Sequence, residues 1–129
     1  MEAHTRTAAV RLVAPAPREA HGGHGPWGLT MLYELIRDAI RDKASLTAHY
    51  EGYVRFFSPH VLGEDSGGAA IVVAFQYGGG RRGGLPPRGD WACFYLAGLS
   101  GVERNMDEWL VGPLTAKPVH ALKYIDIAA

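Results

Sequence analysis

The chain has 129 residues, which suits one domain of ordinary size and is too short for two. Its 13 basic residues balance its 13 acidic residues, so a strongly basic nucleic-acid coat or an acidic tail is excluded as a property of the whole chain. A hydrophobic content of 47% supplies one core, and 17 glycines with 8 prolines favour a loop-rich β protein over a helical bundle.

A single cysteine, Cys93, excludes a disulfide framework within the chain and a zinc ribbon. A lone cysteine favours a reducing, cytoplasmic compartment. Because Cys93 lies in an apolar segment, we expect a buried, inert thiol. No apolar run reaches the roughly 18 to 20 residues that span a bilayer, and the first 26 residues lack the apolar segment of a secretory signal. We therefore expect no association with a membrane.

Residues 1–28 predict a flexible N-terminal arm, followed by a single domain over residues 29–129. Within the arm, residues 8–14 fit one short strand that ends at Pro15, and the glycine-rich residues 21–26 are typical of a linker.

The next segment predicts a helix with Thr30 as its N-cap. Its apolar side chains recur at helical spacing and form one stripe: Met31, Leu32, Leu35, Ile36, Ala39 and Ile40. Most such stripes pack on the protein's own core. A protein partner or a homodimer through this end stays open, because further apolar side chains surround the helix start: Trp27, Leu29 and Tyr33.

After Ser45, apolar residues recur at every second position, which is typical of a strand. Strands over 46–50 and 53–58 around the turn candidate Glu51-Gly52 predict a β-hairpin. Pro59 predicts an extended or bulged exit, after which residues 60–63 continue. Further strands are expected at 69–77, 91–97 and 121–127, with turns at 98–102 and 112–113. The predicted fold class is therefore mainly β with one N-terminal helix. A small, partly open β-barrel is the economical form, because closure removes exposed strand edges.

The order of several segments resembles a bacterial WYL domain. Residues 35–40, His49-Tyr50-Glu51-Gly52, Arg55 and residues 59–63 are similar to its opening. Residues 71–75, 91–96 and 99–102 are similar to its later strands and closing segment, so the resemblance covers roughly residues 32–105.

This resemblance implies an SH3-like or Sm-like barrel and a ligand-sensing role for a nucleotide or nucleic acid, often in transcription regulators. It also places Tyr50 and Arg55 near the ligand surface. Two positions depart from the family pattern. Ile71-Val72-Val73 stand where the family has Trp-Tyr-Leu, and Ala92 or Cys93 stands where the family has an arginine.

The segment 78–89 contains six glycines, two prolines and three arginines, namely Arg81, Arg82 and Arg88. Guanidinium groups on such a segment suit phosphate binding, because each offers a planar fork of donors. The flanking strands add aromatic side chains that can stack on bases: Phe75, Tyr77 and Trp91. An exposed loop without a ligand accounts for the same composition, and the segment lacks the Gly-Lys-Ser/Thr ending of a Walker loop.

A second polar set follows the predicted hairpin: His49, Tyr50, Arg55, His60 and Gln76. His49 and Arg55 are expected to approach each other across the turn and, with Gln76, to line a pocket. Two histidines can bind a metal, but no carboxylate stands at a spacing that completes a ligand set, so we expect neither a metal nor a cofactor. A structural or surface role is the simpler account of each of these residues.

These features predict a non-enzymatic, stand-alone binding module that senses a nucleotide or short nucleic acid. Its expected ligand-binding residues are Tyr50, Arg55, His60, Gln76, Arg81, Arg82, Arg88 and Trp91. The alternative is an accessory subunit that binds a protein partner and no small molecule, which the zero net charge and the departures from the family pattern favour. A small enzyme acting through His49 or His60 is disfavoured, because spacing assembles no nucleophile, base and orienting group.

Overall fold

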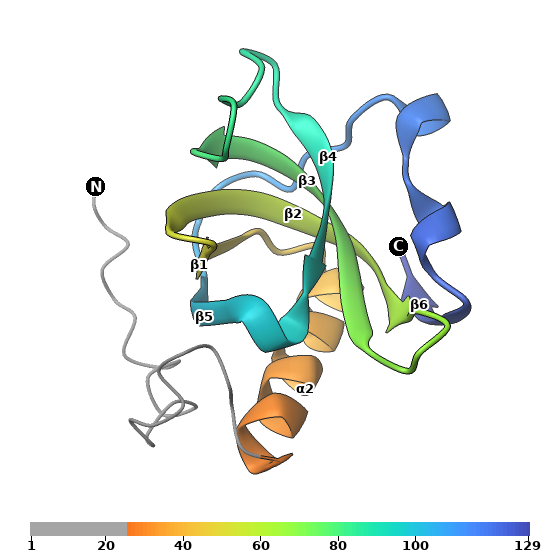
Figure 1. The fold of residues 1–129 in the computed structure, drawn as a ribbon. Coiled ribbons are helices and arrows are strands. Elements are labelled where there is room, and N and C mark those ends of the chain that lie inside the picture. The colour runs from red at the N-terminus through yellow and green to blue at the C-terminus, as the bar shows by residue number, and fades with distance from the viewer. Residues whose placement is uncertain (1–25) are drawn as a thin grey trace.

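The computed structural model describes residues 26–129, which form one antiparallel sheet and a single α-helix (Figure 1). The helix α2 spans Pro26–Asp42. The strands are β1 (Leu46–Tyr50), β2 (Tyr53–Glu64), β3 (Ala70–Gly79), β4 (Asp90–Tyr95), β5 (Leu99–Arg104) and β6 (Tyr124–Ala128). Three short 3-10 helices complete the chain: η3 (Leu96–Gly98), η4 (Leu114–Ala116) and η5 (Val119–Ala121).

The strands follow the order β4-β3-β2-β1-β5, and β6 pairs with β2. The long strand β2 pairs with β3 over most of its length, with β1 through its first residues and with β6 through residues 61–64. The mainly β class with one helix is thus confirmed for the described residues. The sheet curves strongly but is not closed, since β4 and β5 form the two ends of the strand order and do not pair with each other (Figure 1).

Helix α2 covers one face of the sheet, which we call the inner face. Leu32, Ile36, Ala39 and Ile40 are buried there. They pack on inner-face side chains that include Ala48, Phe57, Leu62, Val72, Ala74 and Phe94. The predicted stripe is therefore confirmed except at Met31, which is exposed. No helix within residues 26–129 is long and apolar enough to cross a membrane.

The helix begins four residues before the predicted N-cap. Proline is well suited to a first helical turn, where its missing amide would have no partner, so Pro26 starts the helix and Thr30 lies inside it. The last three residues of the predicted arm therefore belong to α2. The rest of the predicted arm, with its expected strand and linker, lies outside the described residues.

The predicted hairpin is confirmed. Tyr50 pairs with Tyr53 across a two-residue turn, in which Glu51 has φ 51° and Gly52 has φ 84°. The predicted bulged exit at Pro59 is confirmed, because β2 continues through Pro59 as a bulged strand. Pro59 pairs with Ala74 and Val61 pairs with Val73, so His60 is the extra residue of a β-bulge.

Two further boundaries differ from the sequence prediction. Residues 98–102, expected as a turn, mostly belong to β5, which pairs with β1 through His49 and Ser100. The last strand begins at Tyr124, after two 3-10 turns. At residues 98–102, pairing with a distant strand overrides the local preference of the sequence, whereas residues 119–121 form a local 3-10 turn in place of extended backbone.

A strap formed by residues 105–113 crosses the other face of the sheet, which we call the outer face. The Leu110 amide donates to Ser58 Oγ at 2.8 Å, and Trp109 Nε1 donates to the Pro59 carbonyl at 3.0 Å. Asn105 Nδ2 donates to Thr47 Oγ1 at 2.9 Å. The strap covers a small second core made of Val61, Val73, Phe75 and Trp91.

A close backbone approach at Gly63 joins β6 to β2. A Cβ at this position would collide with the Tyr124 carbonyl oxygen and lie 3.0 Å from Ile125 Cα. We predict that Gly63→Ala lowers the free energy of unfolding by about 1–3 kcal/mol, because β6 must shift. The measurement is urea denaturation, with amide exchange of residues 124–128 as a local probe. Gly67→Ala, in an exposed turn with only Asp65 Oδ1 nearby at 3.5 Å, is the control and should change stability little.

Candidate functional site

A buried arginine lies at the end of the inner face. Arg55 on β2 is only 5% exposed, and its Nε and Nη2 donate to the Tyr50 carbonyl at 3.3 and 3.1 Å. Its Nη1 donates to Gln76 Oε1 at 3.2 Å. The fully buried Gln76 donates in turn to the carbonyls of Gly78 and Gly80 at 2.9 and 3.0 Å. Arg55 and Gln76 therefore tie the hairpin turn to the start of the β3–β4 loop.

The surroundings of Arg55 are mainly neutral and aromatic. Its guanidinium carbon lies 5.4 to 5.5 Å from the ring centres of Tyr50, Tyr53 and Phe94. The carboxylate of Glu51 lies 3.8 Å away, and its side chain is 71% exposed. Burial lowers the pKa of Arg55, the charge of Glu51 opposes that shift, and nearby Arg81 adds to it. An arginine stays charged in such a setting, so the site holds a positive charge that one exposed carboxylate compensates poorly.

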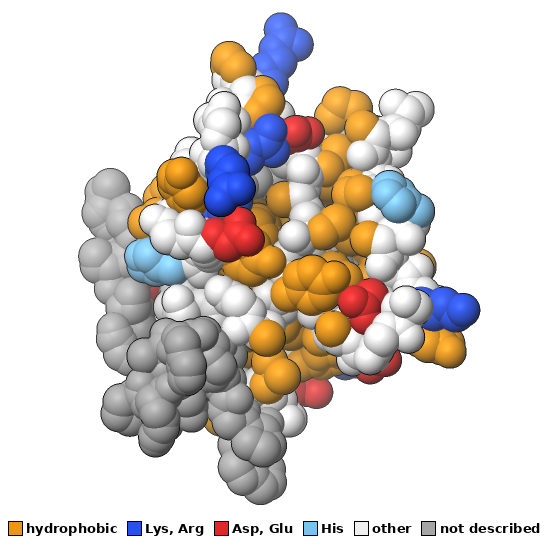
Figure 2. Space-filling view, viewed as in Figure 1, with side chains coloured by type: hydrophobic (Ala, Val, Ile, Leu, Met, Phe, Trp, Pro, Cys, Tyr) orange, Lys and Arg blue, Asp and Glu red, His pale blue; other side chains and the backbone are white. Residues whose placement is uncertain are grey.

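The β3–β4 loop carries three more guanidinium groups beside this site. Arg81 donates to the Gly84 carbonyl at 3.0 Å and pairs with Asp90 at 3.1 Å. Arg82 and Arg88 are exposed and have no polar partner among residues 26–129. Figure 2 shows basic side chains gathered at the end of the molecule where this loop lies. We call Arg55, Arg81, Arg82 and Arg88, together with this loop, the basic end.

His60 and Trp91 lie on the outer face instead. In the β3–β4 register, Gln76 pairs with Asp90 whereas Phe75 pairs with Trp91, so alternation places Trp91 on the face opposite Gln76. His60 is buried, stacks on Trp109 at 4.1 Å and meets the edge of Trp91 at 4.9 Å. Its Nε2 lies 2.9 Å from the Leu110 carbonyl, and Trp91 Nε1 donates to the Pro113 carbonyl at 2.8 Å. Both side chains hold the strap.

The structure thus divides the eight predicted ligand-binding residues between two faces. Tyr50, Arg55 and Gln76 lie together and connect to the loop arginines, whereas the sheet separates His60 and Trp91 from them. His49 opposes Val54 while Arg55 opposes Ala48, so His49 and Arg55 are not partners across the turn. No group of three metal-ligating side chains occurs within residues 26–129.

Two residues near the basic end were not assigned this place from the sequence. Asp90 is the anionic partner of Arg81. Tyr53 is 39% exposed and packs against both Arg55 and Gly80, where a Cβ would lie 2.8 Å from its ring. The two-residue turn predicted from the sequence sets Tyr53 opposite Tyr50, and this pairing could have indicated that Tyr53 lies beside Arg55.

Cys93 is half-buried, and burial raises the pKa of its thiol. A raised pKa lowers the thiolate fraction at neutral pH, as expected for an inert cysteine.

We predict that Arg55→Lys lowers the free energy of unfolding by about 2–3 kcal/mol. A lysine cannot serve both the Tyr50 carbonyl and Gln76 with the same geometry, so buried acceptors lose their donors. Urea denaturation measures the change. Arg104→Lys, at an exposed pair with Asp42, is the matched control and should cost less than about 0.5 kcal/mol.

We also predict that His60 makes the fold acid-sensitive. Burial lowers its pKa from the ordinary 6.5, and Lys117 and Lys43 lower it further, against the bond to Leu110. The unfolded chain therefore binds the proton more readily than the folded chain. The stability contributed by neutral His60 is fully present above about pH 6.5, and it is lost as the pH falls from there toward the lowered pKa. In stability curves against pH, His60→Gln should flatten this decline. An equally steep decline in the variant would contradict the assignment.

Comparisons of the chain with protein-family models, with curated proteins and with solved structures find no match. The WYL resemblance therefore stays a prediction, and the candidate function rests on the geometry of the basic end.

Proposed function

We propose that the chain is a non-enzymatic, ligand-sensing module that binds a nucleotide or a short single-stranded nucleic acid at the basic end. The observation that carries this proposal is a buried, charged Arg55 below a loop with two exposed arginines that have no partner among the described residues. Such a constellation attracts phosphate, because the exposed groups are free to bind it and the buried one adds a fixed positive field.

The charge balance of this end supports an anionic ligand. Four guanidinium groups, of Arg55, Arg81, Arg82 and Arg88, stand against two carboxylates, of Glu51 and Asp90, which leaves two positive charges in excess. The whole chain has a net charge of zero, so this excess is local. Local charge of one sign steers a ligand of the opposite sign toward that surface.

The roles of the residues follow from their exposure. Arg82 and Arg88 would contact phosphate, and the partly exposed ring of Tyr53 would stack on a base. Arg55 and Gln76 would act as positioning residues, because their polar atoms already hold the turn and the loop. His60 and Trp91 have no part in this ligand site.

The resemblance to WYL domains fits this proposal. A curved, open sheet with a short covering helix is consistent with a partly open barrel of SH3-like or Sm-like type, in which binding loops project from the strand ends. We therefore place the protein among cytoplasmic regulators that report a ligand to a partner and use no cofactor.

An accessory protein-binding role is the second candidate. The C-terminal part of the chain exposes several large apolar side chains: Val111, Leu114, Val119, Tyr124 and Ile125. Exposed apolar side chains in one segment favour a protein interface. Size-exclusion chromatography of the protein alone and with candidate partners would separate this role from ligand sensing.

We predict that Arg82→Gln with Arg88→Gln weakens binding of a fluorescein-labelled thymidine oligonucleotide and of a nucleoside triphosphate. If each arginine neutralises one phosphate of a single strand, the slope of log affinity against log salt should fall by about 1.4. Fluorescence anisotropy across a salt series measures the affinity and its dependence on salt. The matched control, Arg41→Gln with Arg104→Gln, removes the same charge from exposed ion pairs with Asp38 and Asp42. Equal effects of the two double variants would refute the assignment.

A further inference from the structure

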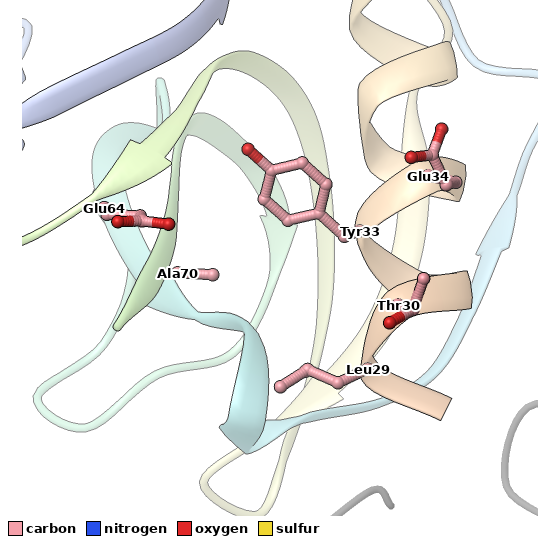
Figure 3. Close-up of a pocket in the computed structure, with 6 residues that line it drawn as sticks. All are labelled: Leu29, Thr30, Tyr33, Glu34, Glu64 and Ala70. Carbon is pink, nitrogen blue, oxygen red and sulfur yellow. The ribbon is translucent and has the colours of Figure 1, made fainter. Parts of the chain in front are cut away.

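A groove lies between α2 and the sheet (Figure 3). Its lining residues Glu64 and Ala70 flank the β2–β3 turn, which lies away from the β3–β4 loop (Figure 1). The groove consists of two adjoining hollows of about 290 and 250 Å³ that share Tyr33 and Glu64. The first is lined by Leu29, Thr30, Tyr33, Glu34, Glu64 and Ala70. The second adds Gly63, Tyr124, Ile125 and Asp126.

The walls of the groove are apolar and aromatic. In Figure 3, the side chains of Leu29 and Tyr33 extend from α2 toward Glu64 and Ala70. The hydroxyl of Tyr33 donates to Asp126 Oδ2 at 2.7 Å, which fixes the ring between the two hollows. Tyr124 and Ile125 are both exposed beside the second hollow.

The rim of the groove is acidic. Glu34, Glu64 and Asp126 line it. Among residues 26–129, Arg37 lies 3.4 Å from Asp126, and the backbone amide of Lys123 bonds to the Glu64 carbonyl, so three carboxylates stand near two cations. The raised pKa of the Tyr33 hydroxyl agrees with this charge balance. Burial is its main cause, Asp126 and Glu64 add to it, and Arg37 alone opposes it. The groove therefore combines aromatic walls with an excess of negative charge.

We propose that this groove binds an extended, arginine- or lysine-containing peptide segment of a protein partner. Long basic side chains lay an apolar stem along a hydrophobic wall and place their charge at a carboxylate, which is the combination the groove offers. Cations also bind favourably against tyrosine rings. Two neighbouring hollows of about 290 and 250 Å³ suit two side chains of one peptide.

The proposal does not depend on nucleotide binding. The groove shares no lining residue with the basic end, and it lies at the opposite end of the fold, beside the β2–β3 turn (Figure 1). An acidic peptide groove and a basic ligand end on one small domain would allow ligand sensing and partner binding to be measured separately.

The test is fluorescence anisotropy of the full chain with a short fluorescein-labelled peptide that carries arginine at alternate positions among alanines. We expect saturable binding that weakens with salt, and no comparable binding of the same peptide with glutamine in place of arginine. Glu34→Gln and Glu64→Gln should each lower the affinity about two- to fivefold. Ala70→Leu should abolish binding by filling the first hollow, and its thermal midpoint checks that it folds.

Two controls make the result decisive. Glu108→Gln removes an exposed carboxylate on the strap, outside both hollows, and should leave the affinity unchanged. The double change Arg82→Gln with Arg88→Gln should also leave peptide binding intact, so loss of nucleotide binding and loss of peptide binding are distinguishable. Absence of saturable binding, equal binding of the glutamine peptide, or equal losses in Glu64→Gln and Glu108→Gln would overturn the proposal.

Discussion

The pairing of β2 with three other strands is the constraint on which the remaining structure depends. One strand of 12 residues meets β3 along one edge, and β1 and then β6 along the other. Its backbone therefore fixes the hairpin turn, the groove below α2 and the floor of the second core. The bulge at His60 changes the alternation along β2, so that His60 and Val61 both contribute to the outer face, while Leu62 packs in the inner core.

The two faces of this sheet use polar groups in different ways. On the inner face, Arg55 and Gln76 satisfy backbone carbonyls and leave a buried charge near the surface. On the outer face, Ser58 and His60 bind the strap, and their surroundings are aromatic and closed. Exposed side chains adjoin the buried charge only at the end of the inner face among the described residues. Our proposal therefore assigns ligand recognition to that end and not to the surroundings of His60.

Local patterns in the sequence predicted the helix, the hairpin and the buried strand β3, because each depends on neighbouring residues. Residues 98–102 were predicted as a turn because of Gly98 and Gly101, yet pairing with β1 makes most of them strand. The face of His60 could not be predicted, because one extra residue in β2 changes the alternation there. The face of Trp91 depends on the register between β3 and β4, which the long loop between them leaves open. The groove escaped prediction as well, since Leu29, Glu64 and Tyr124 are distant along the chain.

The strap is attached through its backbone and through three of its side chains, those of Asn105, Asp107 and Trp109. Side chains of Ser45, just before β1, and of the sheet bond to main-chain atoms of Glu108, Leu110 and Pro113. The side chains of Glu108 and Val111 are exposed to solvent. The attachment therefore constrains Asn105, Asp107 and Trp109 but not the side chains of Glu108 and Val111. Evolution could therefore change the charge and polarity of the strap surface at Glu108 and Val111 while the sheet beneath it stays the same.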